Sequence, residues 1–121
     1  MRLGVLSDLH ANLPALEAAL EALRAEGVDE VLVLGDLVGY GPHPRQVIHR
    51  IWEEGLAAIA GAWDLRVAYP LPGPLPEGVG KATLEWTRAQ LGEKELAYLR
   101  SLRLSHRKSY GGMRLVAFHG K

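Results

Sequence analysis

Two short polar segments of this 121-residue chain carry residues that could bind a metal ion. The first reads Ser7-Asp8-Leu9-His10 and the second contains Gly35-Asp36, and each follows an apolar run. If the two apolar runs are neighbouring parallel strands, their carboxyl ends meet at one edge of a sheet and bring Asp8, His10 and Asp36 together. Carboxylate oxygens and imidazole nitrogens are ligands for divalent transition metals. The sequence therefore predicts a metal site at this edge.

The apolar pattern predicts the elements that would position these ligands. Three short apolar runs have the composition of strands buried on both faces: residues 3–6, 31–34 and 56–60. Between the first two, Asn12 can cap a helix whose leucines recur at helical spacing until Gly27. Between the second and third, Pro44 begins a helix and Gly55 ends it. Because strand-helix-strand connections join parallel strands, we expect an α/β fold with a parallel β-α-β-α-β core.

The remainder of the chain predicts flanking helices and a hairpin. Proline and glycine crowd into residues 70–80, which indicates a surface loop or linker. Leucines at helical spacing predict helices over residues 81–91 and 93–102. The segment 104–118 contains Gly111-Gly112 between two runs of strand-like composition, which is typical of a β-hairpin.

Length and composition limit the classes of protein to which this chain can belong. The length favours a single domain spanning residues 1–121. Fourteen basic residues balance fourteen acidic ones, so no overall positive field favours binding to nucleic acid or to an anionic membrane. Cysteine is absent, which excludes disulfides and thiolate ligands. We see no leader and no apolar run long enough to cross a membrane, and therefore expect a cytoplasmic location.

Several motifs, in this order along the chain, resemble the calcineurin-like metallophosphoesterases, and in particular the small bacterial phosphodiesterase branch. The matching segments are Asp8-Leu9-His10, Gly35-Asp36, Gly39-Tyr40-Gly41-Pro42 with Pro44, Gly61-Ala62-Trp63-Asp64 and Phe118-His119-Gly120. A series of such blocks in order is far more specific than a lone Asp-x-His. The resemblance covers the whole chain but only the first half of such a domain, so we expect a truncated version of the family's two-sheet sandwich.

The resemblance implies a two-metal site that activates water for in-line attack on a phosphoester, with Mn, Fe, Zn or Ni as the divalent cations. Asp8 and His10 would bind the first cation, Asp36 would bridge both and serve catalysis, and His119 would bind the second.

The block that resembles the family's Gly-Asn-His-Asp departs from it twice. Ala62 stands where a ligating asparagine is expected, and Trp63 stands where a histidine would protonate the leaving group. Asp64, the usual partner of that histidine and hence a vestigial catalytic residue, has nothing to orient. A later Gly-His-x-His motif has no counterpart before the chain stops at Lys121. The sequence leaves open whether one ion, or none, still binds.

Two functions from different classes remain. The first is a non-catalytic remnant that keeps the fold for binding or assembly, with little or no activity alone. The second is a metal-dependent phosphodiesterase or phosphatase completed by a second chain that supplies the missing half. Ala62 and Trp63 favour the remnant, because these substitutions remove a ligand and the general acid independently of the chain's length.

Other residues could contact a phosphoester substrate or a partner. Tyr40, His43 and Arg45 lie in the region expected to face a phosphate, although the sequence favours a solvated turn for His43. An open strand edge and an apolar hairpin face favour pairing. We therefore expect a homo-oligomer through residues 104–118, or a complex with a complementary C-terminal fragment.

Overall fold

The computed structural model describes residues 1–69 and 77–120. Its elements follow in the order β1 (Leu3–Leu6), α1 (Leu13–Ala25), β2 (Glu30–Val33), α2 (Pro44–Glu53), β3 (Ala57–Ala58), α3 (Ala62–Ala68), α4 (Val79–Gln90), α5 (Glu93–Ser101), β4 (Ser105–Tyr110) and β5 (Met113–Phe118). The predicted Pro/Gly loop lies largely outside the described residues.

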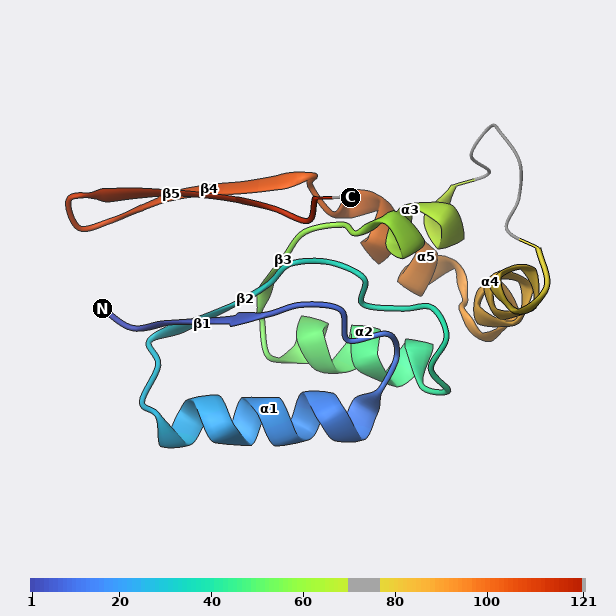
Figure 1. The fold of residues 1–121 in the computed structure, drawn as a ribbon, viewed down its shortest axis with the longest axis horizontal. Coiled ribbons are helices and arrows are strands. Elements are labelled where there is room, and N and C mark those ends of the chain that lie inside the picture. The colour runs from blue at the N-terminus through green and yellow to red at the C-terminus, as the bar shows by residue number, and fades with distance from the viewer. Residues whose placement is uncertain (70–76, 121) are drawn as a thin grey trace.

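Strands β1, β2 and β3 form a sheet in that order, and both pairings are parallel. The predicted α/β class and parallel core are therefore confirmed. Helices α1 and α2 cover one face of this sheet, and the antiparallel hairpin β4–β5 lies along the opposite face (Figure 1). The helices α3, α4 and α5 group beyond the carboxyl ends of the strands.

Local sequence explains the two crossover helices. The Asn12 side chain accepts a hydrogen bond from the Ala15 amide at 3.0 Å, and thereby caps α1. Pro44 occupies the first turn of α2, where a missing N–H costs nothing. The side chains of Val47, Ile48 and Ile51 are fully buried, so this apolar face of α2 packs into the core.

Two details differ from the sequence-based prediction. Strand β3 has only two residues. The Ile59 amide still donates to the Val33 carbonyl of β2 at 3.0 Å, but Ile59 also forms an isolated bridge with Arg103, and the Ala60 amide donates to the Arg103 carbonyl at 2.9 Å. Residues 62–68 form the helix α3, which the sequence did not predict. The Asp64 carboxylate accepts the Gly61 N–H at 2.9 Å and so caps the first turn of this helix.

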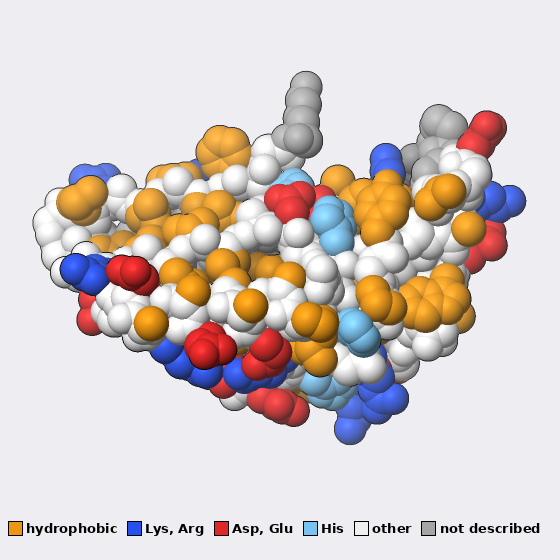
Figure 2. All heavy atoms as spheres, turned by 60° about the horizontal axis from the view of Figure 1, so that its bottom comes forward, with side chains coloured by type: hydrophobic (Ala, Val, Ile, Leu, Met, Phe, Trp, Pro, Cys, Tyr) orange, Lys and Arg blue, Asp and Glu red, His pale blue; other side chains and the backbone are white. Residues whose placement is uncertain are grey.

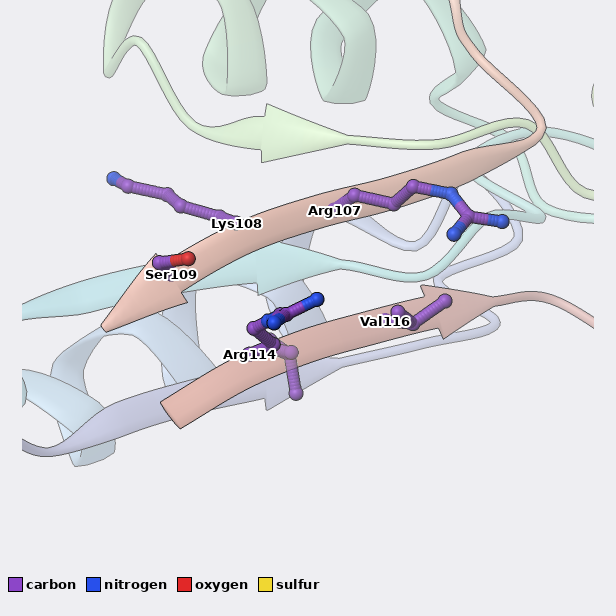
Figure 3. A pocket seen from close by; sticks show the side chains of 6 residues that line it. Arg107, Lys108, Ser109, Arg114 and Val116 are labelled. Atoms are coloured by element: carbon purple, nitrogen blue, oxygen red, sulfur yellow. The ribbon is translucent and has the colours of Figure 1, made fainter. Parts of the chain in front are cut away.

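The hairpin is tied to the sheet by polar contacts at β2. Lys108 donates to Glu30 at 2.7 Å, and the Tyr110 hydroxyl donates to the same carboxylate at 3.1 Å. Arg107 and Val116 are cross-strand partners, and the alternation of a strand puts them on the face opposite to Lys108 and Tyr110. Arg107, Lys108, Ser109, Arg114 and Val116 line a shallow recess on the hairpin (Figure 3).

None of the helices within residues 1–69 and 77–120 combines the length and the apolar character that crossing a membrane requires.

Candidate metal centre

Backbone hydrogen bonds join the two loops that follow β1 and β2. The amide of Asp8 donates to the carbonyl of Gly35 at 3.0 Å, and the amide of His10 donates to the carbonyl of Asp36 at 2.9 Å. Parallel pairing thus continues past the strand ends into the loops. As a result, Asp8, His10 and Asp36 lie at one edge of the sheet.

The backbone at this edge adopts a left-handed conformation that residues other than glycine rarely take. Asp8, His10, Asp36 and Tyr40 all have positive φ angles, between 45° and 64°. A left-handed residue other than glycine costs about 1–3 kcal/mol and persists only where the surroundings hold it. Such strain clusters at functional sites, since it aims side chains in directions that regular structure does not allow.

One oxygen or nitrogen atom from each of Asp8, His10 and Asp36 lies within 4.8 Å of those from the other two. The Asp36 side chain is 8% exposed and that of Asp8 is 53% exposed. The cluster therefore has a buried floor and a side that is open to solvent. In Figure 2, acidic and histidine side chains adjoin one another at the surface, with hydrophobic side chains beside them.

Two histidines are oriented in the same way around Asp36. Nδ1 of His10 lies 3.3 Å from the carbonyl oxygen of Val38, and Nδ1 of His119 lies 2.6 Å from that of Leu34. A carbonyl can only accept, so a neutral ring in either position is protonated at Nδ1 and carries its lone pair on Nε2. The two Nε2 atoms lie 3.7 Å and 3.2 Å from Oδ2 of Asp36.

When both rings are neutral, this arrangement points the lone pair of each Nε2 atom at the Asp36 carboxylate. A neutral imidazole Nε2 and a carboxylate oxygen repel unless a proton or a cation lies between them. A backbone carbonyl behind the ring is also the usual partner of a metal-binding histidine. The donor set and its orientation therefore fit a divalent cation.

The surroundings of the cluster shift the pKa values of Asp8 and His119 in the directions that favour their charged forms. The Ser7 hydroxyl, which donates to Asp8 at 2.5 Å, lowers the pKa of that carboxyl, and the histidines His119 and His10 lower it further. The Leu34 carbonyl raises the pKa of His119, and the carboxylates of Asp36 and Asp8 act in the same direction. Asp8 is thus held as an anion, ready to bind a cation.

The segment that departs from the family pattern lies directly against Asp36. The Trp63 amide donates to Oδ1 of Asp36 at 3.0 Å, whereas the Ala62 side chain is exposed and offers no ligand atom. Asp64 is fully buried and accepts from the amides of Val38 and Gly61. Burial raises the pKa of Asp64 to about 6. In this chain Asp64 orients backbone rather than a histidine.

The three predicted substrate contacts have different surroundings. The Tyr40 ring is 55% exposed, and its centroid lies 5.5 Å from that of His10. His43 precedes α2, and its amide donates to the carbonyl of Ala11. Nε of Arg45 lies 3.8 Å from the Glu95 carboxylate, on the side of α5. Tyr40 is the one of the three whose ring contacts a residue of the cluster.

Some residues that shape the site were missed in the sequence. The carbonyls of Leu34 and Val38 orient the histidines, and a carbonyl gives no signal because every residue has one. Gly35 and Gly61 did carry a signal. A Cβ on Gly35 would lie 2.5 Å from the Gly61 amide, and one on Gly61 would lie 2.2 Å from the Asp36 carboxylate. Only glycine at both positions allows the two loops to approach this closely.

Comparison with known proteins supports the family resemblance. The family model for the calcineurin-like phosphoesterase superfamily domain matches residues 1–121. Phosphodiesterase YfcE of Escherichia coli K12 is 34% identical over 68 residues, which cover 50% of this chain and 37% of that protein.

Two solved structures share the fold over 94% of this chain. A metallophosphoesterase from Sphaerobacter thermophilus is 37% identical, with a TM-score of 0.71 over 45% of its length. Hypothetical protein PH1004 from Pyrococcus horikoshii OT3 is 31% identical, with a TM-score of 0.82 over 52% of its length. The chain spans about half the length of the relatives that it matches, or less.

Proposed function

Since the chain belongs to the calcineurin-like phosphoesterase superfamily, whose members depend on metals, we propose that it binds one divalent cation and, through that cation, a phosphoester. Asp8, His10 and Asp36 would hold the ion, and His119 lies close enough to Asp36 to contribute. The observation that carries the proposal is the convergence of two imidazole Nε2 atoms on the Asp36 carboxylate, each ring fixed by a backbone carbonyl. The donor set suits Mn, Fe, Zn or Ni.

Each residue of the centre has a task that follows from its position. Asp36 is buried between the two imidazoles and supplies negative charge to both. Val38 and Leu34 hold the rings so that Nε2 faces the cluster, and Ser7 keeps Asp8 ionised. A bound divalent cation would supply Lewis acidity toward a phosphoryl oxygen at the open side, beside Asp8.

We further propose that this chain alone hydrolyses phosphoesters slowly or not at all. Trp63 has no proton to give a leaving group at neutral pH, and Ala62 has no ligand atom for a second cation. The indole also packs against the loop of Gly39. Binding without efficient turnover is the function that these substitutions favour.

A second candidate is a phosphodiesterase whose metal pair is completed by another chain. It is favoured by His119, whose Nε2 lies 3.2 Å from Asp36 in the orientation of a ligand that a single cation at Asp8 and His10 does not need. In that case the partner would supply the remaining ligands and the general acid.

Calorimetric titration with Mn²⁺ tests the first proposal. We expect one ion per chain, and we expect Asp36→Asn and His10→Gln to weaken binding by more than about tenfold, since loss of even an outer partner costs that much. His106→Gln is the matched control, because this histidine lies on the hairpin beside Tyr110 and should leave the affinity unchanged. Equal binding by the wild type and Asp36→Asn would refute the proposal. Two ions per chain would favour the second candidate.

A further inference from the structure

A row of aromatic rings begins at the metal cluster and leads away from it. The ring centroids of His10 and Tyr40 are 5.5 Å apart, and those of Tyr40 and Trp63 are 4.7 Å apart. Both pairs meet edge to face, at 77° and 65°. Tyr40 lies in the middle of the row and is more than half exposed, so it presents an open aromatic surface next to a candidate metal ligand.

The backbone that carries Tyr40 is held by its neighbours. Its backbone has φ of 64°, and its amide donates to the Thr83 hydroxyl of α4 at 2.8 Å. A Cβ on the following residue, Gly41, would lie 2.0 Å from the His10 carbonyl oxygen, so the loop is pressed against the metal-binding segment. A strained backbone that fixes a large exposed side chain is typical of a preorganised binding surface.

Trp63 fixes the far side of the row. Its indole touches the backbone of Gly39, where an added Cβ would lie 3.2–3.3 Å from the side chain. The Arg66 guanidinium lies 5.2 Å from the indole centroid, within the range of a cation–π contact. Because the Trp63 amide also donates to Asp36, the indole and the cluster keep a fixed relation.

We propose that Tyr40 and Trp63 form an aromatic platform that stacks the planar group of a phosphoester whose phosphate lies at the Asp8–His10–Asp36 cluster. The platform adjoins His10, so it meets a ring that is carried on or near the phosphate, such as a nucleobase or an aryl group. Stacking tolerates any flat π-system, whereas a phosphate on a sugar alone gains nothing from it. The inference rests on the proposed metal-dependent binding of phosphoesters and adds the class of ligand.

Three probes separate the contributions to binding. AMP carries a base, phenyl phosphate carries an aryl ring, and ribose 5-phosphate carries neither. With the protein loaded with Mn²⁺, we expect AMP to bind at least about fivefold more tightly than ribose 5-phosphate, the lower end of what stacking a base on an aromatic side chain contributes. Preference for AMP alone would assign the platform to nucleobases, and equal preference for phenyl phosphate would assign it to aryl rings in general.

Variants of Tyr40 test the platform itself. Tyr40→Ala should abolish the preference and leave the affinity for ribose 5-phosphate unchanged, whereas Tyr40→Phe keeps the ring and should keep the preference. Trp52→Phe is the control, because that indole stacks on Tyr98 and on His49 instead. If Tyr40→Ala fails to fold, nuclear Overhauser contacts between the adenine protons and the Tyr40 ring of the wild-type protein, with Zn²⁺ in place of paramagnetic Mn²⁺, provide the same test.

The outcomes distinguish the two proposals. Any one of three results would overturn the platform. The wild type could bind AMP and ribose 5-phosphate with equal affinity, or Tyr40→Ala could lose the same affinity for both ligands. The third result is that neither AMP nor phenyl phosphate binds. Metal-independent binding of ribose 5-phosphate that also survives Asp36→Asn would instead contradict the proposed function, whatever the preference for a ring.

Discussion

The Nε2 atom of His119 lies 3.2 Å from Oδ2 of Asp36, although one residue follows the last strand and the other follows the second. The hairpin therefore places a nitrogen that can bind a metal at the edge of the parallel sheet where the strands end. Nε2 of His10 approaches the same Oδ2 atom at 3.7 Å. Asp36 is the centre of the site, and removing its charge should affect every property that depends on a cation.

The first prediction concerns turnover. The purified chain with excess Mn²⁺ should not hydrolyse bis-nitrophenyl phosphate at a rate that depends on Asp36, because the described residues offer no second complete ligand set and Trp63 cannot act as an acid. The measurement is the release of nitrophenolate by the wild type and by Asp36→Asn, which should be indistinguishable. Manganese-dependent turnover that disappears in Asp36→Asn would show that this chain is an enzyme by itself.

The second prediction concerns Ala62. Ala62→Asn restores the amide oxygen that the family pattern places there, but Trp63 still stands in place of the acid. We therefore expect no more than a small gain in the same assay. Ala62→Leu is the matched control, because leucine is close to asparagine in shape but has no ligand atom, and this position is exposed. A large rescue by Ala62→Asn alone would mean that a missing ligand, and not the missing acid, limits the reaction.

The third prediction concerns the pH dependence of stability. Burial raises the pKa of Asp64 from 3.8 to about 6 in the folded protein. Between these values the unfolded chain ionises first, so the free energy of unfolding falls as the pH rises through this window and stays lower above it. The shift corresponds to about 3 kcal/mol.

Urea unfolding of the wild type and Asp64→Asn at pH 4 and pH 7 measures this contribution. Other titrating groups are common to both proteins and cancel in the difference. The stability advantage of the wild type over the variant should therefore shrink from pH 4 to pH 7. An advantage that is constant or grows would show that the hydrogen bonds from Gly61 and Val38 outweigh burial of the charge.

The predictions that the structure confirms depend on residues that are close together in the sequence. The α1 cap at Asn12 and the start of α2 at Pro44 are local, and buried residues at helical spacing confirm both helices. The predicted strands ended at Asp8 and Asp36, which was enough to infer a shared edge, because parallel strands carry their carboxyl ends to the same side.

Where the sequence failed, the cause is an interaction between distant segments. Helix α3 depends on the buried Asp64 carboxylate, which accepts from Gly61 nearby and from Val38 in another loop. The left-handed backbone of Asp8, His10 and Tyr40 is imposed by the contact between loops. Asp and His adopt this conformation more often than most residues, but residue type alone does not locate it. The aromatic row follows from that backbone, so it too was visible only in three dimensions.

The last prediction concerns assembly through the hairpin. Among the described residues, β4 and β5 pair only with each other, so each leaves an edge open. Val116 is 48% exposed and Phe118 66%, and strand alternation places both on the face that points away from Glu30. An open edge beside exposed apolar side chains favours pairing with a second copy, and a two-fold contact would place the same hairpin on both sides.

We expect a homodimer at micromolar concentration with an interface above about 1,000 Å² in total. Val116→Lys should dissociate it without lowering the stability of the monomer, since this side chain faces away from the sheet. Ala22→Lys adds the same charge at an exposed position of α1 and should leave the dimer intact. Light scattering coupled to gel filtration gives the mass of each protein. If the wild type elutes as a monomer of 13.2 kDa, the hairpin is stable without a second copy and the prediction is wrong.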